Sequence, residues 1–163
     1  IIYGLTPQGL VRNLKMDGIN ITLDDSTRFI QAFFSKFPQL AQWLEHQRTR
    51  VGNWVYTQSG RRVFVSPFNA NLTMNAPVQG TGADMMKLWL VHFHRYCMEH
   101  QLPYPVIMAV HDEIVMHSPE YFVDTYVELL KKAFKNAQDD LFPNCPFDFK
   151  MDYAVGDAWS DKA

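Results

Sequence analysis

The chain has 163 residues, 47% hydrophobic and 14% aromatic, which is enough to bury a core as one domain with at most a small extra lobe. Its formal net charge of −2 excludes a uniformly basic nucleic-acid binder. Residues 1–87 hold nine Lys or Arg against five Asp or Glu, whereas residues 88–163 hold six against twelve. This segregation is typical of a protein that grips a polyanion with one part and holds cations with another, although chance segregation explains it equally well.

The two cysteines, Cys97 and Cys145, lie far apart and have no spacing typical of a metal site. They form no disulfide framework and are consistent with a reducing compartment. No apolar run is long enough to span a membrane, and no signal peptide is visible. We therefore expect a cytoplasmic protein that has no membrane partner.

Two N-terminal helices are predicted by their start signals. Residues 7–14 follow a threonine and begin with a proline, the usual order at a helix N-terminus. The sequence TLDD at residues 22–25 has the form of a capping box, a hydroxyl followed three residues later by a carboxylate. Phenylalanines recur every four residues behind it, and Pro38 then breaks or kinks this second helix.

The rest of the chain alternates predicted hairpins with predicted helices. A Ser-Gly turn inside WVYTQSGRRVFV indicates a β-hairpin over residues 54–65. The following elements are a helix over 74–100, a second hairpin of 106–110 and 114–116, a third helix from residue 120, and a half-buried strand over 147–155. Helices packed on a small antiparallel sheet give an α+β fold.

The second hairpin contains the sequence VHDEIV, in which a histidine and two carboxylates interrupt an apolar run. We expect residues 106–117 to be buried strand. Burying a carboxylate costs several kcal/mol unless it is paired, hydrogen-bonded or bound to a metal. A rigid carboxylate such as Asp112 or Glu113 at the tip of a hairpin is suited to Mg²⁺, which prefers oxygen ligands. The alternative is a plain turn, where Asp is simply a favoured residue.

The sequence NAPVQGTGADMMK, residues 75–87, places two glycines just before an amphipathic helix. Gly80 and Gly82 remove side chains, so another backbone or a nucleic acid can approach closely, and Asn75 and Gln79 offer amide donors nearby. The alternative is a glycine-rich helix entry that serves only packing.

Arg61 and Arg62 lie next to the predicted turn of the first hairpin. Paired arginines on a rigid turn can contact phosphates, although exposed arginines that only keep a protein in solution are commoner. His92 and His94 are two residues apart on a predicted helix, so their rings point to different faces and cannot share a metal.

Taken in order, these segments resemble the C-terminal part of a family A DNA polymerase of the bacterial DNA polymerase I type. IIYG resembles the tail of the family's fingers motif, and NAPVQGTGADMMK resembles its N-x-P-x-Q-G-T-A-A-D stretch. VHDEIV matches its V-H-D-E motif, VGDAWS resembles its usual chain end, and the Gly-Arg-Arg turn also has a counterpart. Motif order and spacing agree along nearly all 163 residues.

The resemblance implies a polymerase palm with part of the fingers: residues 1–53 as distal fingers helices, and residues 54–163 as a palm portion with the metal-binding hairpin. Asp112 resembles the second of two catalytic aspartates that hold a pair of Mg²⁺ ions, and Glu113 resembles an auxiliary catalytic carboxylate. The strand that bears the first aspartate has no counterpart in these residues, so the two-metal site would be completed by an upstream segment.

The resemblance also implies contacts with DNA. Gln79 and Asn75 would touch the minor groove of the nascent duplex, where acceptors are similar in every correct pair. The further implied positions are His111 near the primer terminus, Arg61 and Arg62 on DNA, and Tyr3 and Gly4 at the templating position. Two departures weaken the match: Gly82 replaces the family's usual Ala, and Asn71 stands near an expected arginine that grips the primer strand.

The function implied is template-directed DNA synthesis, in which a nucleotide is transferred to a primer 3′-hydroxyl. Its partners would be primer-template DNA, a deoxynucleoside triphosphate, and an upstream polymerase segment from the same parent chain or from a split subunit. Because that segment carries the nucleotide-binding residues of the fingers, we expect the chain alone to be inactive. The alternative is a non-catalytic DNA-binding or assembly module that retains the palm fold.

Overall fold

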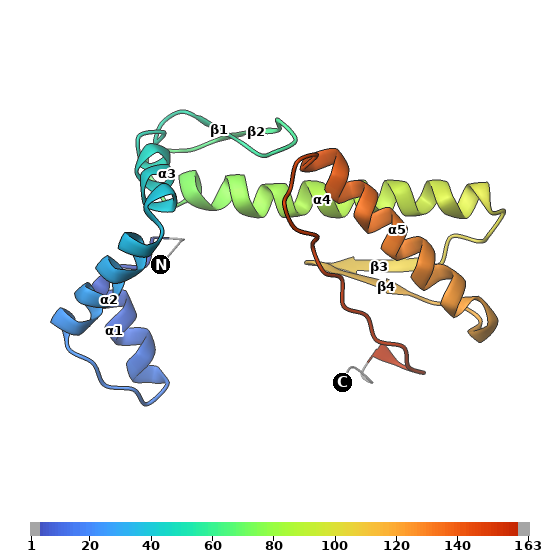
Figure 1. The fold of residues 1–163 in the computed structure, drawn as a ribbon, viewed down its shortest axis with the longest axis horizontal. Coiled ribbons are helices and arrows are strands. Elements are labelled where there is room, and N and C mark those ends of the chain that lie inside the picture. The colour runs from blue at the N-terminus through green and yellow to red at the C-terminus, as the bar shows by residue number, and fades with distance from the viewer. Residues whose placement is uncertain (1–3, 160–163) are drawn as a thin grey trace. The chain divides into compact units, whose positions relative to one another are not determined.

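The computed structural model describes residues 4–159, and the chain divides into two compact units, Ile1–Gly80 and Thr81–Ala163 (Figure 1). Each unit combines helices with one two-stranded antiparallel sheet. The predicted mixture of helices and small antiparallel sheets is confirmed.

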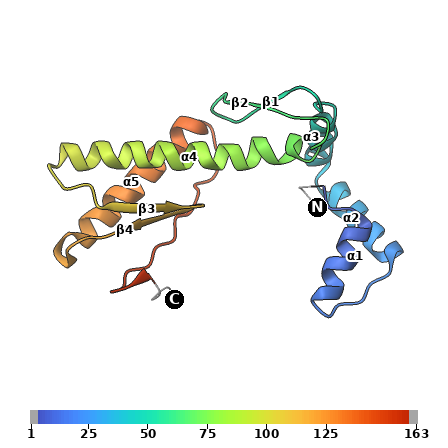
Figure 2. The ribbon, with the colours of Figure 1, turned by 180° about the vertical axis from the view of Figure 1, so that it is seen from behind.

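The first unit begins with three helices; the first two start where their predicted start signals lie, and the first ends two residues later than predicted. They are α1 (Pro7–Met16), α2 (Leu23–Lys36) and α3 (Pro38–Arg48). Helices α1 and α2 lie side by side in Figures 1 and 2, and the buried Ser26 hydroxyl of α2 donates to the Pro7 carbonyl oxygen over 2.9 Å. Pro38 separates α2 from α3, because its ring cannot continue a helix without a lost hydrogen bond.

The predicted capping box at the start of α2 forms in full. The Thr22 hydroxyl oxygen accepts a hydrogen bond from the Asp25 backbone N–H over 3.0 Å. The Asp25 carboxylate accepts in return from the Thr22 hydroxyl over 2.6 Å and from the Thr22 backbone N–H over 3.2 Å. These bonds to Thr22, together with the nearby Arg28 guanidinium, lower the pKa of Asp25. The helix therefore starts where the sequence signal places it.

The predicted first hairpin consists of β1 (Trp54–Tyr56) and β2 (Arg62–Phe64), which pair antiparallel. Its inner face carries Val55 and Val63, which pack with Val65 against the start of α4 (Leu72–Glu99). The backbone N–H of Gly52 donates to the Val65 carbonyl over 2.9 Å and extends the hairpin beyond the strands.

The second unit contains the C-terminal part of α4 and the elements that follow it: β3 (Val106–Val110), β4 (Glu113–Met116), the 3-10 turn η1 (Glu120–Phe122) and α5 (Val123–Leu141). Its core lies between α4 and α5 and is built from Trp89, Phe93, Cys97, Tyr126, Leu129, Leu130, Ala133 and Ala137. Inside this core the Trp89 indole N–H donates to the Leu130 carbonyl over 3.0 Å, and this buried hydrogen bond joins the two helices.

The strand predicted over residues 147–155 is wrong, because this segment has no regular structure. A strand needs a neighbour to pair with its backbone, and no described strand pairs with this segment. The buried Gln138 takes that place instead: its Nε2 donates to the Phe147 carbonyl over 2.9 Å, and its Oε1 accepts from the Phe149 N–H over 2.8 Å.

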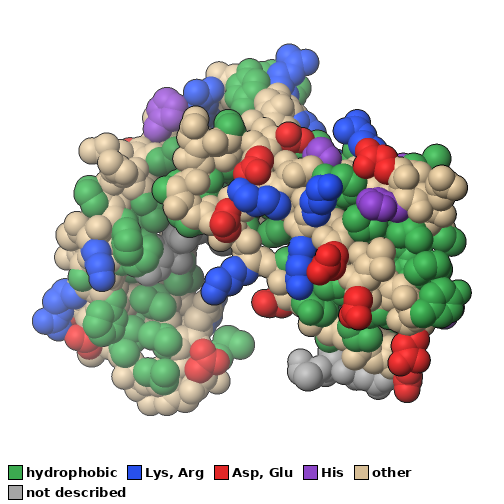
Figure 3. All heavy atoms as spheres, turned by 45° about the vertical axis from the view of Figure 1, so that its right-hand side comes forward, with side chains coloured by type: hydrophobic (Ala, Val, Ile, Leu, Met, Phe, Trp, Pro, Cys, Tyr) green, Lys and Arg blue, Asp and Glu red, His purple; other side chains and the backbone are tan. Residues whose placement is uncertain are grey.

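Hydrophobic side chains remain on the surface in both units, as the green spheres of Figure 3 show. Among the described residues, no helix combines the length and apolar character that a membrane span requires. Cys97 and Cys145 are both free, as the sequence indicates.

Replacing Gln138 by alanine should lower the free energy of unfolding by about 1–3 kcal/mol, because two backbone groups of the tail lose their partner. Urea unfolding measures this change, and hydrogen exchange at Phe149 should accelerate. The matched control is Gln31→Ala, which truncates an exposed glutamine of α2 and should change stability by less than about 0.5 kcal/mol. Equal effects of the two substitutions would contradict the role of Gln138.

Candidate functional site

The β3–β4 hairpin presents His111 and Asp112 as its two-residue loop. Val110 and Glu113 pair across the hairpin, so the loop between them is as short as a hairpin allows. His111 adopts a positive φ of 55°, the backbone region that such short loops use and that histidine enters more readily than most residues. The predicted tight turn is therefore confirmed.

Of the predicted buried strand over residues 106–117, the strand structure forms as β3 and β4, but the predicted burial is wrong. Ile107 is 67% exposed and Met108 is 38% exposed, and the loop side chains His111 and Asp112 are exposed together with Glu113. Only the inner face of the hairpin, with Val106, Ile114 and Met116, packs against the helical core. In a two-stranded hairpin each strand has an open edge, and within the described residues nothing covers the outer face. Because Asp112 is exposed to solvent, its charge needs no metal ion to offset a cost of burial.

Carboxylate oxygens at the hairpin tip are still suitable donors for Mg²⁺, a hard cation that takes six oxygen ligands. Asp112 and Glu113 supply part of such a set. Within residues 4–159, no group of three or more His, Cys, Asp or Glu side chains is arranged to hold a metal. The two carboxylates fit the cation chemically but would not hold it alone, so a Mg²⁺ ion at this tip would take its remaining ligands from phosphate, water or another polypeptide segment.

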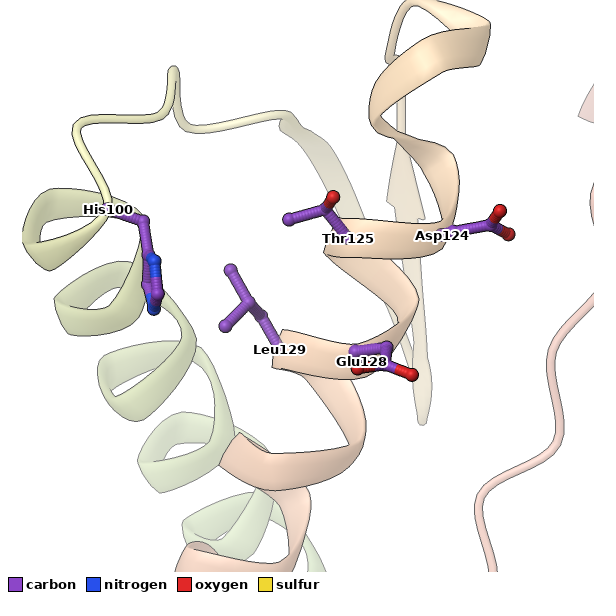
Figure 4. Close-up of a pocket in the computed structure, with 5 residues that line it drawn as sticks. All are labelled: His100, Asp124, Thr125, Glu128 and Leu129. Atoms are coloured by element: carbon purple, nitrogen blue, oxygen red, sulfur yellow. The ribbon is translucent and has the colours of Figure 1, made fainter.

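Two further acidic residues, Asp124 and Glu128, lie in the first turns of α5 and do not form a metal site (Figure 4). Figure 4 shows a pocket lined by His100, Asp124, Thr125, Glu128 and Leu129. The His100 ring and the Leu129 side chain face each other, whereas the carboxylates of Asp124 and Glu128 point away from them. Because these donors do not converge on one point, the pocket carries no cation chemistry.

The start of α4 carries the two predicted amide residues. Asn75 and Gln79 are four residues apart, which places them on the same face of the helix. Gln79 is exposed, and Asn75 is half-buried with its Oδ1 enclosed. That oxygen has no hydrogen-bond partner in the part of the chain that the structure describes. Pro77 lies between them inside the helix, which continues past it.

Gly80 allows the first hairpin to touch α4. A Cβ atom at this position would lie 2.6 Å from Thr57 Cγ2 and 3.1 Å from Arg61 Nη2. Arg61 also donates from Nη2 to the Gly80 carbonyl over 3.0 Å. The sequence predicted that the glycines either allow another backbone or a nucleic acid to approach the helix closely or serve packing alone. At Gly80 a close approach is observed, and the approaching group is the β1–β2 hairpin. At Gly82 a Cβ would meet nothing within 4 Å.

Arg61 and Arg62 have different surroundings although they are neighbours. The Arg61 guanidinium donates to the Gly80 carbonyl of α4, and the Arg61 backbone N–H donates to the Thr57 hydroxyl over 3.2 Å. Arg62 lies over the Trp54 ring, with its guanidinium carbon 5.1 Å from the ring centroid. The first arginine fixes the hairpin on α4, and the second lies on the outer face of the hairpin.

The remaining predicted position is the Tyr-Gly pair. Tyr3 lies outside the described residues. Gly4 adopts a φ of 84°, and a Cβ there would lie 3.0 Å from Asn71 Oδ1. Asn71, which stands near the position of an expected arginine, therefore packs against Gly4.

The structure groups the predicted residues by unit. Gly4, the two arginines and the two amides belong to the first unit, and His111, Asp112 and Glu113 belong to the second. Sequence reasoning gave no role to Asp84, which is only 7% exposed. Its place inside the quoted motif NAPVQGTGADMMK was the signal that could have drawn attention to it.

Comparison with known proteins identifies the family. The model of DNA polymerase family A matches residues 1–161, and the chain belongs to this family. The predicted resemblance is thereby confirmed. The DNA polymerase I of Caldicellulosiruptor bescii is 29% identical over 149 residues, which cover 84% of this chain and 17% of that protein. The DNA polymerase I of Geobacillus stearothermophilus is 27% identical and is covered over 19% of its length by 99% of this chain.

The chain therefore spans less than a fifth of the length of these two relatives. A solved structure, the POL domain of Pol1 from M. smegmatis in complex with DNA primer-template and dNTP, is similar with a TM-score of 0.73 at 23% identity. It covers 83% of this chain, and this chain covers 25% of it. This likeness shows that the fold is that of part of a polymerase domain.

The two glycines of α4 should respond in opposite ways to alanine. Gly80→Ala should lower the free energy of unfolding by about 1–3 kcal/mol, because Thr57 is buried and β-branched and cannot swing away from the new methyl group. Gly82→Ala should raise it by about 0.5–1 kcal/mol, because the methyl group meets no neighbour and alanine favours a helix. Urea unfolding of both variants tests this, and equal shifts would contradict the packing role of Gly80.

Proposed function

We propose that this chain takes part in template-directed DNA synthesis as the C-terminal part of a family A DNA polymerase. The observation that carries the proposal is the family match over residues 1–161 together with the V-H-D-E motif at the tip of a short hairpin. Residues 1–53 are proposed as distal fingers helices and residues 54–163 as the palm portion. The proposed partners are primer-template DNA, a deoxynucleoside triphosphate and an upstream polymerase segment, in the cytoplasm.

Asp112 is the proposed metal ligand and catalytic residue. The two-residue loop fixes the backbone position of Asp112 at the hairpin tip, and its exposure leaves the carboxylate accessible to a cation and to phosphates. A divalent metal such as Mg²⁺, when bound, stabilises the charge that develops on a transferring phosphoryl group and activates the attacking hydroxyl. Glu113 is proposed as an auxiliary carboxylate beside it, and an upstream segment completes the two-metal site.

The first unit supplies the proposed contacts with duplex DNA. Asn75 and Gln79 share one helix face, and the amide group is suited to the acceptors of the minor groove. The side-chain NH2 groups are the donors that this assignment uses; the enclosed Asn75 Oδ1 is an acceptor and takes no part in it. Arg61 and Arg62 are proposed to lie near the DNA backbone, and His111 near the primer terminus. Tyr3 and Gly4 are proposed for the templating position.

A non-catalytic DNA-binding or assembly module is the second candidate function. It is favoured by the incomplete set of metal ligands within residues 4–159. The two functions differ in how DNA binding depends on metal. The polymerase function is supported if Mg²⁺ raises the affinity of the native chain for primer-template but does not raise that of Asp112→Asn. The binding module is supported if the affinity of both proteins depends on salt concentration alone.

Primer extension tests the proposed function directly. The purified chain alone should show no extension, whereas the chain mixed with the upstream polypeptide of its parent gene should extend a primer in Mg²⁺. Asp112→Asn should reduce that rate by about a thousandfold or more, because several kcal/mol of charge stabilisation are lost. Glu113→Gln should have a smaller effect.

The matched control for Asp112 is Asp124→Asn, which neutralises an exposed aspartate of α5 and should leave extension unchanged. Robust extension by the chain alone would contradict the need for an upstream segment. Extension by the mixture that survives Asp112→Asn would contradict the role of the hairpin.

A further inference from the structure

A long stretch of the first unit lacks acidic residues. Residues 46–83 contain four arginines, Arg48, Arg50, Arg61 and Arg62, and no aspartate or glutamate. The nearest carboxylates in sequence are Glu45 and Asp84, at the two ends of the stretch. Because the whole chain has a net charge of −2, this local excess of positive charge is not a general property of the protein. Arg48 forms an ion pair with Glu45 over 3.1 Å, so the positive charge that would attract a polyanion comes from the other three arginines.

The β1–β2 hairpin in the middle of this stretch has an aromatic outer face. Strand alternation turns Val55 and Val63 inward and leaves Trp54, Tyr56, Arg62 and Phe64 on the opposite side. Trp54 is 40% exposed, Tyr56 51% and Phe64 50%. The three half-exposed rings together form an exposed apolar patch, and such patches generally mark interaction sites.

The rings are arranged by the register of the hairpin. Trp54 is directly opposite Phe64, and their ring centroids lie 5.4 Å apart with an interplanar angle of 66°. Tyr56 is opposite Arg62, whose guanidinium lies against the Trp54 ring. The face therefore joins three aromatic rings to a planar cation. Arg61, held by the Gly80 carbonyl, keeps the inner face of the hairpin fixed on α4.

We propose that the outer face of the β1–β2 hairpin is a stacking surface for unpaired nucleotides of a single-stranded nucleic acid. Bases stack on aromatic rings and on guanidinium planes regardless of sequence, and arginine also attracts the phosphates between them. The lack of carboxylates from residue 46 to 83 favours a polyanion, and the three exposed rings favour one that carries bases over an acidic protein segment.

The inference goes beyond nucleotidyl transfer and does not depend on it. All of its residues lie in the first unit, and none is a proposed metal ligand. Stacking on this face should occur without Mg²⁺ and without an upstream segment. A failed primer-extension experiment would therefore leave it standing, and its own failure would leave the polymerase assignment standing.

Fluorescence anisotropy with a labelled oligo(dT) of about 12–16 nucleotides, in EDTA, tests the surface. The comparison ligand is an oligonucleotide of the same length made of abasic sites, which keeps the phosphates and lacks the bases. The purified chain should bind oligo(dT) about tenfold or more tightly than the abasic strand. The double variant Trp54→Ala, Phe64→Ala should lose this preference, and so should Tyr56→Ala in part.

Two control variants separate stacking from general damage. Trp54→Phe keeps a ring at the site and should retain most of the preference for bases. Tyr121→Ala removes a ring that is 78% exposed in the second unit and should retain all of it. Tyr56 takes part in no ring pair among the described residues, so Tyr56→Ala remains informative if the double variant does not fold.

Three results would overturn the proposal. The first is equal affinity of the native chain for oligo(dT) and the abasic strand, which would mean that only phosphates are bound. The second is an absence of binding to either strand. The third is a preference for bases that persists both in Tyr56→Ala and in the double variant, which would mean that the bases bind elsewhere on the chain.

Discussion

A two-stranded hairpin is at best marginally stable in water by itself, and the position of Asp112 therefore depends on the packing of β3–β4 against helices. The inner face of the hairpin, with Val106, Ile114 and Met116, rests on the core between α4 and α5. That core is joined by the buried bond from the Trp89 indole to the Leu130 carbonyl. The short loop then fixes the backbone of Asp112, so a helical core sets the position of a residue at the surface of the protein.

The first unit uses the same principle with a different contact. Its hairpin packs Val55 and Val63 against α4, and the absence of a side chain at Gly80 lets Thr57 and Arg61 reach the helix backbone. In both hairpins the inner face packs against a helix and provides stability. The residues proposed to bind a ligand lie at the tip of β3–β4 and on the outer face of β1–β2. The proposed polymerase function assigns the metal to one hairpin, and the stacking proposal assigns unpaired bases to the other.

Local signals in the sequence predicted the local structure well. The capping box at Thr22, the proline at the start of α3 and the short turn at His111 depend on neighbouring residues alone, and each formed as expected. Predictions that depend on distant neighbours were wrong. The apolar residues over 106–117 predicted burial, but no described element covers the outer face of that hairpin. The alternation over 147–155 predicted a strand, but no described strand pairs with this segment. The contact between Gly80 and Thr57 was beyond reach for the same reason.

The central claim is that Asp112 holds a divalent metal during nucleotidyl transfer. The most direct measurement is affinity cleavage, in which Fe²⁺ replaces Mg²⁺ and cuts the polypeptide near its binding site. The chain is first assembled with its upstream segment, primer-template and nucleotide, and the cut peptides are identified by mass spectrometry. The account predicts metal-dependent cuts next to residues 111–113 that excess Mg²⁺ suppresses and that Asp112→Asn abolishes. Cuts confined to other parts of the chain, or cuts beside the hairpin that persist in Asp112→Asn, would contradict it.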